Sequence, residues 1–376
     1  MPKCPCHICN QPLEYPEELA GQQVECPHCG TQTKLPVMSD ILVRIPSAVD
    51  ESIRQSAESP IANVAQKVLS NMGKVVVGKD ETMALALTAC LADGHVLFED
   101  VPGVAKTMLA RAMAVSMGCP FKRIQCTPDL LPSDISGSSV FNPKTTDFEF
   151  RAGPLFTQVL LADEINRATP RAQSALLEAM AERRVTVDGK THSLEAPFFL
   201  IATQNPIDHE GTFPLPEAQL DRFLMRLHLG YPGADLEIQM LQNNQLQHPI
   251  ETLEAVTDSS EVLECQAAVR NIKVHPKVAG YVVDIVEASR NHDDIQLGAS
   301  PRASLALFRC AQSYAGIHGY DFVTPDDVKY LAPFIMMHLL LLKPETRLRK
   351  RSAKDIMRDI LNSISVPQIR TEDLNT

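Results

Sequence analysis

The chain has 376 residues, a net charge of −11 and a pI near 5.5. This length predicts two or three domains rather than a single core. The acidic balance argues against nucleic acid as the main partner, although it leaves room for a local basic patch. The longest apolar run, near residues 334–342, is far shorter than a membrane span. The start of the chain has no apolar stretch after its single lysine, so we expect no signal peptide and a cytoplasmic protein.

Five of the ten cysteines lie in the first 29 residues, and four of them form two C-x-x-C pairs. The pairs are Cys6 with Cys9 and Cys26 with Cys29. Each pair offers two thiolates from one tight turn, and two such turns supply the four soft ligands of a tetrahedral zinc site. A segment this short cannot fold on apolar burial alone, so the metal would supply folding free energy. We therefore predict a small zinc ribbon over residues 1–35, with a structural Zn²⁺.

Two alternatives accompany the zinc site. A disulfide would require an oxidising compartment, which nothing else in the chain indicates. Cys4 and His7 lie close enough in sequence to compete as ligands. Residues 36–59, rich in Ser, Asp, Glu and Pro, read as a linker with room for one short strand. The other five cysteines are scattered, and we expect them in the core.

A nucleotide-binding pattern follows in the middle of the chain. A strand predicted over residues 95–99 leads into the loop Asp100-Val101-Pro102-Gly103-Val104-Ala105-Lys106-Thr107, and a helix is expected over residues 108–117. The loop Pro102-Gly103-Val104-Ala105 and the helix start would wrap phosphates. The backbone N–H groups would bind them at every position except the proline, which lacks an N–H. Lys106 would pair with the β and γ phosphates of ATP, and the Thr107 hydroxyl would hold Mg²⁺. Asp100 and Ala105 depart from the general pattern, which has glycine at both positions.

Two further apolar strands end in polar residues. Residues 159–163 end in Asp163 and Glu164. We expect Asp163 to hold Mg²⁺ through water and Glu164 to activate the attacking water as general base. The strand expected over residues 197–202 leads to Asn205, which could orient the same water. By itself this asparagine could equally be a turn residue.

These residues occur in the order typical of AAA+ ATPases, and the phrases between them resemble one branch, the MoxR family. The phrases are Leu130-Leu131-Pro132-Ser133-Asp134-Ile135, Phe150-Arg151-Ala152-Gly153-Pro154, Ala162-Asp163-Glu164-Ile165-Asn166-Arg167-Ala168, Ala202-Thr203-Gln204-Asn205-Pro206, Leu220-Asp221-Arg222-Phe223 and Gly298-Ala299-Ser300-Pro301-Arg302-Ala303. The resemblance covers about residues 60–345. Members of the family tolerate the changes at Asp100 and Ala105.

The resemblance implies further roles. Asn205 resembles the first sensor, and Arg302 the second sensor, which reaches from the lid to the γ-phosphate. Arg222 resembles the arginine finger that acts on a neighbouring subunit's ATP, where a fixed charge and a forked donor suit phosphate oxygens. Val77 and Gly78 resemble the segment that lines the adenine pocket. The structural alternatives are a surface ion pair for Arg222 and a solvated helix start for Arg302.

The expected fold is an α/β P-loop AAA+ core with a parallel sheet over residues 60–230, followed by a helical lid over 231–345 and a C-terminal helix and tail over 346–376. Residues 136–150 read as an inserted loop or small hairpin, and residues 184–194 as a hairpin turning at Asp188-Gly189. Residues 347–364 begin with a basic stretch and continue as an amphipathic helix. We expect this segment to pack on the lid rather than to contact a phosphate or nucleic acid.

The leading functional hypothesis is a homo-oligomeric, hexameric ring that hydrolyses ATP with Mg²⁺ and remodels or matures partner proteins. The resemblance implies partners with von Willebrand factor type A domains. The alternative is a nucleic-acid-dependent AAA+ motor or regulator that uses the zinc ribbon to contact DNA or RNA. A third hypothesis, a nucleotide-binding scaffold without hydrolysis, conflicts with the presence of Glu164.

Overall fold

The computed structural model describes residues 59–206, 212–243 and 248–368, together with four short N-terminal strands. The chain divides into two compact units, Met1–Glu51 and Ser52–Thr376. In the first unit, the strands pair as two antiparallel hairpins: β1 (Lys3–Pro5) with β2 (Pro12–Glu14), and β3 (Gln23–Glu25) with β4 (Gln32–Lys34). The expected zinc ligands Cys6, Cys9, Cys26 and Cys29, as well as His7 and residues 36–58 of the linker, lie outside the described residues.

A five-stranded sheet forms the centre of the second unit, in the order β13-β5-β12-β9-β6. All neighbouring strands are parallel. The strands are β5 (Val96–Glu99), β6 (Phe121–Gln125), β9 (Val159–Asp163), β12 (Phe199–Gln204) and β13 (Met225–Leu227). The predicted parallel α/β core is therefore confirmed, with β6 and β13 added to the three strands that the sequence indicated.

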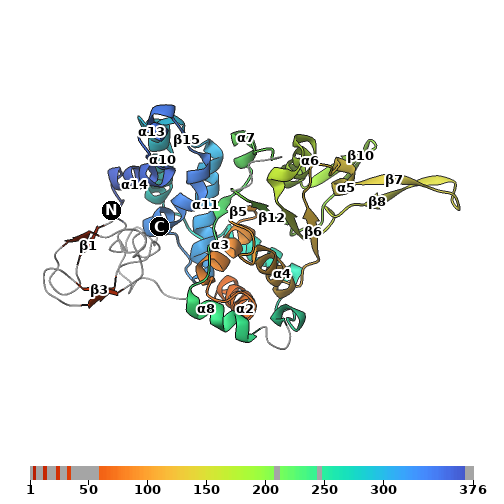
Figure 1. Cartoon of the computed structure of the whole chain (residues 1–376), viewed down its shortest axis with the longest axis horizontal. Coiled ribbons are helices and arrows are strands. Elements are labelled where there is room, and N and C mark those ends of the chain that lie inside the picture. Colours follow the sequence, from red (N-terminus) through yellow and green to blue (C-terminus); the bar gives the residue numbers. More distant parts are fainter. Residues whose placement is uncertain are drawn as a thin grey trace. The chain divides into compact units, whose positions relative to one another are not determined.

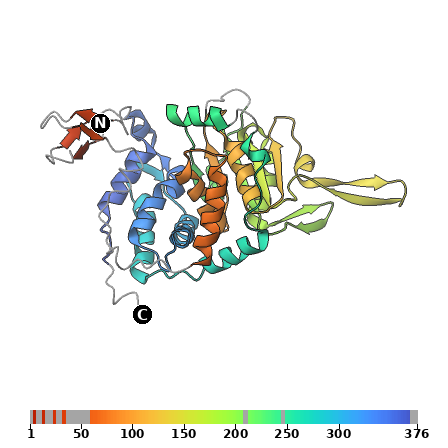
Figure 2. The ribbon, with the colours of Figure 1, turned by 90° about the horizontal axis from the view of Figure 1, so that it is seen from below.

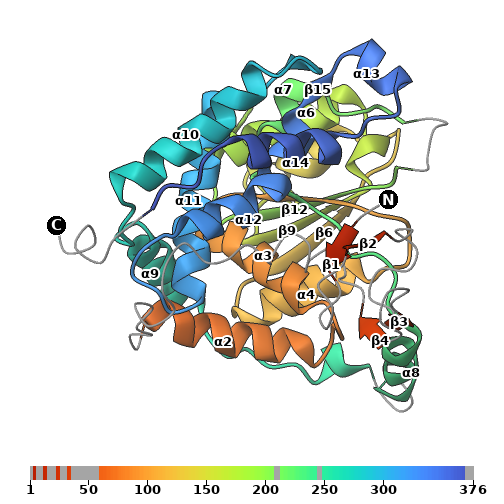
Figure 3. The same ribbon diagram turned by 90° about the vertical axis from the view of Figure 1, so that its left-hand side faces the viewer.

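Both faces of the sheet are covered, which explains why the central strands are almost continuously apolar. Val96 and Phe98 point into one core cluster and Leu97 into the other. The first cluster is built from α2 (Pro60–Gly73), α3 (Asp80–Leu91), α4 (Lys106–Ser116) and the lid. The second cluster contains α6 (Pro170–Glu182), which lies on the opposite side of the sheet from α2, α3 and α4 (Figure 3). The short elements on this side are α5 (Pro132–Ser136), η3 (Ile165–Arg167) and α7 (Glu217–Leu220).

The C-terminal part is helical, as expected for a lid. After α8 (Ala234–Asn243) and η4 (Pro249–Glu251) come α9 (Ser259–Val269), α10 (Pro276–Arg290), α11 (Pro301–Ile317) and α12 (Pro325–Met336). The predicted start of the last of these is confirmed, because Thr324 and Asp327 form a reciprocal capping box and Pro325 opens the helix. The buried faces of α9 to α12 join the same core cluster as α2 to α4.

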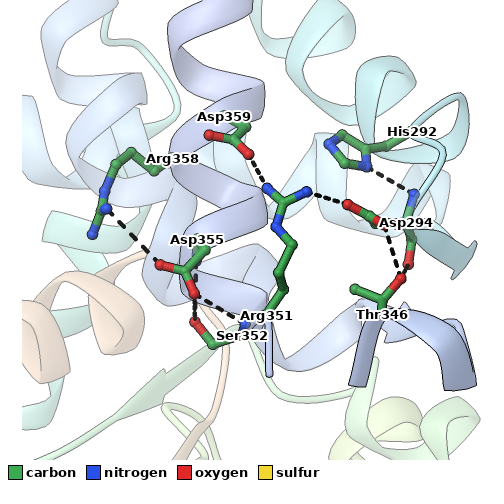
Figure 4. Close-up of polar contacts among 8 residues, drawn as sticks. All are labelled: His292, Asp294, Thr346, Arg351, Ser352, Asp355, Arg358 and Asp359. Carbon is green, nitrogen blue, oxygen red and sulfur yellow. Dashed lines mark hydrogen bonds and ion pairs between the residues drawn. The ribbon is translucent and has the colours of Figure 1, made fainter. Parts of the chain in front are cut away.

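The chain after α12 folds onto the lid. It runs through η5 (Met337–Leu339) and β15 (Leu341–Leu342), which pairs with β14 (Ile295–Leu297), and then α13 (Pro344–Leu348) and α14 (Ala353–Ser363). Arg351 lies between Asp294 and Asp359 and pairs with both, while Thr346 donates a 2.9 Å hydrogen bond to Asp294 (Figure 4). The apolar face of α14 is buried, so the structure supports the lid-packing interpretation of this basic segment.

Two hairpins project from the core on the same side, as Figures 1 and 2 show. The insertion forms β7 (Gly137–Asn142) and β8 (Asp147–Ala152), and the second hairpin forms β10 (Arg184–Val187) and β11 (Lys190–Ser193). Asp188 and Gly189 both have positive φ at its tip, which confirms the predicted turn. The hairpins contact each other where Phe150 stacks on His192, with ring centroids 4.1 Å apart.

No helix in the described part of the chain is long and apolar enough to cross a membrane. Cys90, Cys119, Cys126, Cys265 and Cys310 are buried and free, as predicted. Burial raises the pKa of Cys126 to about 12 and that of Cys265 to about 11. These thiols are therefore protonated packing groups.

Candidate nucleotide site

The polar residues identified in the sequence meet at one edge of the sheet. Because all five strands are parallel, their carboxyl ends share an edge. The P-loop leaves β5 there, Asn205 follows β12, and Asp163 ends β9. Ligands bind at this edge in open α/β sheets. The structure thus brings the three predicted segments together.

The P-loop enters α4 through two residues with positive φ. Gly103 has φ 87° and Ala105 has φ 63°. The second value explains why the general pattern has glycine there, since a left-handed residue with a Cβ costs roughly 1–2 kcal/mol. Lys106 and Thr107 begin α4, whose N-terminal N–H groups and dipole favour an anion.

Lys106 lies back on its own loop. Its Nζ donates to the carbonyl oxygens of Asp100 at 2.6 Å and Val101 at 3.2 Å. Burial lowers the pKa of Lys106, and the charges of Asp100, Asp163 and Glu164 oppose that shift. The ammonium group therefore lies within electrostatic reach of the acidic pair, as a shared phosphate site requires.

Asp163 is held by two groups that the sequence analysis did not identify. The hydroxyl of Thr203, on β12, donates to its Oδ1 at 2.6 Å. Arg123, on β6, donates to its Oδ2 from Nε at 3.2 Å and from a terminal nitrogen at 2.6 Å. The neighbouring strands therefore fix the direction of this carboxylate. In the sheet register, Gln125 on β6 lies opposite Asp163 on β9. This neighbourhood could be inferred only if residues 121–125 were recognised as a strand.

Glu164 leaves the strand in a left-handed conformation, with φ 56°. Such strain in a residue other than glycine is typical of functional sites. Its Oε2 accepts hydrogen bonds of 3.0 Å from both Gln125 and Arg167. The N–H of Glu164 donates to the Thr203 hydroxyl at 2.8 Å, so Thr203 contacts both acidic residues.

The remaining residues of the expected nucleotide site lie nearby in the fold. Asn205 is buried after β12, and its carbonyl oxygen accepts a 3.4 Å hydrogen bond from Asn166. Val77 and Gly78 lie between α2 and α3, where Gly78 has φ 70°. A Cβ at that position would lie 2.3 Å from the end of the Leu236 side chain on α8, so a larger residue would have to displace Leu236 and adopt a strained backbone.

Arg222 and Arg302 lie at the other edge of the sheet. Arg222 precedes β13, a strand parallel to β5, so it lies beside the amino ends of the strands. Arg302 begins α11 and its guanidinium lies 3.9 Å from Asp221, which also accepts the Ser300 hydroxyl at 3.0 Å. Both arginines line one pocket of about 240 Å³ between core and lid.

This placement changes one expectation. A four-residue strand spans roughly 13 Å, so Arg302, paired with Asp221 at the amino ends of the strands, lies about one strand length from the P-loop of its own chain. The structural alternative for Arg302, a solvated helix start, describes its exposed position in a single chain, to which the structure adds the ion pair with Asp221. Arg222 donates to the carbonyl oxygen of Leu177, but its Nε is buried and has no hydrogen-bond partner among the described residues.

The residues at the P-loop edge suit a hard cation. The Thr107 hydroxyl and the Asp163 carboxylate offer oxygen ligands, and ATP phosphates supply others, which is the way Mg²⁺ is usually bound in ATPases. Among the described residues, no group of three His, Cys, Asp or Glu side chains forms a preassembled metal site. A site completed by substrate phosphates requires no such group.

Two family models match the chain. Residues 95–225 match the ATPase family associated with various cellular activities (AAA), and residues 287–360 match the AAA lid domain. The first match spans the sheet and the P-loop, and the second spans α11, α12 and most of α14.

Relatives match over most of the chain. The uncharacterized protein YeaC of Bacillus subtilis is 51% identical over 81% of this chain and 95% of its own length. Chaperone MoxR1 of Mycobacterium tuberculosis is 37% identical over 81% of this chain and 82% of its own. A crystal structure of a protein described as an ATPase from Cytophaga hutchinsonii has a TM-score of 0.77 at 36% identity, covering 82% of this chain and 96% of that one.

Proposed function

Because this chain belongs to the MoxR family of AAA+ ATPases and hydrolyses ATP, we propose that it works as a ring, with Mg²⁺, to remodel or mature partner proteins. The observation that carries the proposal is the convergence of Lys106, Asp163 and Glu164 at the carboxyl edge of one parallel sheet. Charge of both signs meets there, as the transfer of a phosphoryl group to water requires.

Each group has a proposed part in hydrolysis. The loop N–H groups and Lys106 bind and orient the phosphates, while Thr107 and Asp163 hold Mg²⁺, which neutralises charge on the β and γ phosphates when bound. Glu164 accepts a proton from the attacking water, and Asn205 orients that water. Gln125 and Arg167 both donate to Oε2 of Glu164 and so hold the carboxylate in place, which leaves Oε1 to accept the proton from the water.

The arginines complete the site between subunits. Arg222 and Arg302 lie together on the edge away from their own P-loop, so a head-to-tail ring can present both to the neighbour's ATP. Arg302 is exposed, Arg222 is half-buried, and both line the same pocket, which supports this arrangement. A hexamer is the ring size that the family resemblance implies.

A structural zinc ribbon at the N-terminus is a further part of the proposal. Each C-x-x-C pair falls, along the sequence, between two strands that pair as an antiparallel hairpin. Four thiolates close the coordination sphere of Zn²⁺, so we assign this unit a docking or assembly role rather than a catalytic one.

We propose protein partners, and von Willebrand factor type A domains as their class. The name of the MoxR1 relative describes it as a chaperone, and the acidic balance of the chain disfavours phosphate backbones. The nucleic-acid-dependent motor is the alternative, and only the N-terminal cysteine pattern favours it.

Stimulation of ATP turnover separates the two. The purified full-length chain is assayed alone, with a von Willebrand factor type A protein encoded by the same genome, and with single-stranded DNA or RNA. We expect the protein to stimulate turnover severalfold and the nucleic acids to leave it unchanged. Strong stimulation by DNA or RNA that salt abolishes, without any by protein, would favour the alternative.

A further inference from the structure

The connection from the core to the lid begins directly beside the P-loop. It leaves β13 at Leu227 and passes through Leu229, Gly230 and Tyr231 before α8 starts at Ala234. Gly230 has φ 62°, a left-handed conformation that suits a hinge residue. We refer to residues 229–231 as the hinge segment.

Asp100, the residue that replaces the first P-loop glycine, holds this segment. Asp100 is 8% exposed, and its carboxylate accepts hydrogen bonds from the N–H of Leu229 and, at 3.2 Å, from that of Gly230. Hydrogen bonds to a buried charge are among the stronger ones in proteins. A glycine at position 100 would leave both N–H groups without this partner.

The main chain of Asp100 belongs to the nucleotide site. Its carbonyl oxygen accepts Lys106 Nζ at 2.6 Å, and its N–H donates to the carbonyl oxygen of Gln204, next to Asn205, at 3.1 Å. A phosphate that recruits Lys106 removes its bond to this carbonyl group. One residue therefore contacts the phosphate-binding lysine through its main chain and the hinge segment through its side chain.

Lys79 holds the hinge segment from the other side. It follows the Val77-Gly78 segment directly, and its Nζ donates to the carbonyl oxygens of Leu229 at 2.5 Å and Tyr231 at 3.2 Å. Burial lowers the pKa of Lys79, and the charge of Asp100 opposes that shift. Both N–H and C=O groups of Leu229 are thus bound by charged side chains.

We propose that Asp100 and Lys79 are positioning residues that transmit nucleotide occupancy at Lys106 to the hinge segment, and thereby to the lid. The inference rests on ATP binding at the P-loop. The departure of Asp100 from the glycine pattern then has a function, because it makes the start of the P-loop part of the hinge. Loss of either side chain leaves the phosphate-binding groups in place but frees the lid from their state.

The test measures amide hydrogen exchange across residues 226–233 of the full-length chain, with and without ATP, in a Glu164→Gln background that retains the nucleotide. The variants are Asp100→Gly, Asp100→Asn and Lys79→Met. Glu99→Gln is the matched control, because Glu99 pairs with Arg226 on β13 rather than with the hinge segment. Binding of a fluorescent ATP analogue is measured in parallel, and kcat and KM are measured with Glu164 restored.

We expect ATP to change exchange at the hinge segment at least about threefold in the parent and the Glu99 control, and less than about 1.5-fold in Asp100→Gly and Lys79→Met. Analogue affinity should stay within about threefold while kcat falls about tenfold. Asp100→Asn, which keeps an acceptor oxygen, should recover much of the response.

A hinge segment that responds fully to ATP in both Asp100→Gly and Lys79→Met would overturn the inference. So would a loss of analogue binding that parallels the loss of kcat, because the side chains would then serve binding alone. Failure of the parent itself to bind the analogue is a different result, since it would overturn the ATP site and this inference with it.

Discussion

The hydroxyl of Thr203 lies 2.6 Å from Oδ1 of Asp163 and donates a hydrogen bond to it across two neighbouring strands. Thr203 has no exposed surface, and Asp163 is only 9% exposed. The same hydroxyl accepts the N–H of Glu164. A single buried side chain therefore sets the direction of the carboxylate proposed to bind Mg²⁺ and the backbone of the proposed general base.

Thr203→Val should lower kcat about tenfold, because the isosteric change leaves two buried polar groups without their partner. The affinity for ATP should change much less, since the phosphates contact the P-loop. Steady-state kinetics with saturating Mg²⁺ measure both parameters. Thr203→Ser is the control, and it should retain most of the activity. Equal activity of the Val and Ser variants would contradict the role of the hydroxyl.

Arg123→Gln should lower the Mg²⁺ concentration that gives half-maximal turnover, by about two- to fivefold. The reason is that the Arg123 guanidinium pairs with Asp163 and competes with a cation for it. Titration of Mg²⁺ at fixed ATP measures the effect. Lys122→Gln removes the same charge from the adjacent position of β6, where the side chain contacts Gly153 instead, and should have little effect. A shift of the same size in both variants would indicate a general charge effect.

Mixed rings test the placement of Arg302. Arg302→Ala and Lys106→Ala subunits should each be inactive alone, yet a 1:1 mixture should recover about a quarter of wild-type turnover, because intact P-loops would meet intact arginines across subunit interfaces. Arg222→Ala mixed with Lys106→Ala should behave in the same way. Lys106→Ala mixed with Glu164→Gln is the control and should stay inactive. A mixture with Arg302→Ala that stays inactive would place Arg302 beside its own ATP.

The sequence predicted the parts of this site that lie close together along the chain. The P-loop, the strand before Asp163 and the Asp188-Gly189 turn carry their own signals in spacing and polarity. The edge strand β6 was not predicted, because only Ile124 of its five residues is buried and no alternation marks it. Arg123 and Gln125 lie on this strand, so their contacts with Asp163 and Glu164 were not predicted either. The bonds from Asp100 to Leu229 and Gly230 join residues about 130 positions apart, which no local pattern encodes.

The lid shows the same limit. Its helices and the capping box at Thr324 follow from periodicity and capping chemistry, but the edge of the sheet on which it docks depends on packing between distant helices. The sequence therefore associates Arg302 with a γ-phosphate but does not indicate whether that ATP belongs to its own or a neighbouring subunit. The ion pair with Asp221 places Arg302 beside Arg222.

Acidification should destabilise the fold in a defined range. Burial and the charge of Arg183 lower the pKa of His95 to about 3, and burial and the charge of Arg226 lower that of His338 to about 3. Nδ1 of His95 accepts the N–H of Leu200, so protonation would remove that bond. Since an unfolded histidine titrates near 6.5, the unfolded chain binds more protons between pH 6.5 and 3. As the pH is lowered through this range, the free energy of unfolding should therefore decrease, by about 1.4 kcal/mol per pH unit for each histidine.

Denaturant unfolding at pH 7, 6 and 5 measures this slope, in a range above the titration of the carboxylates. His95→Gln should lose about half of it, because one of the two buried histidines no longer titrates. His318→Gln is the control, because His318 is exposed. A slope that is the same with and without His95 would contradict the assignment.

The central claim is that the groups at the carboxyl edge of the sheet bind and cleave one ATP. Its most direct test is to measure ATP retention and phosphate release together, in the unsubstituted chain, in Lys106→Ala and in Glu164→Gln. We predict that Lys106→Ala loses both, while Glu164→Gln retains ATP and loses at least about a hundredfold in phosphate release. Phosphate release by Glu164→Gln at the unsubstituted rate would contradict the account.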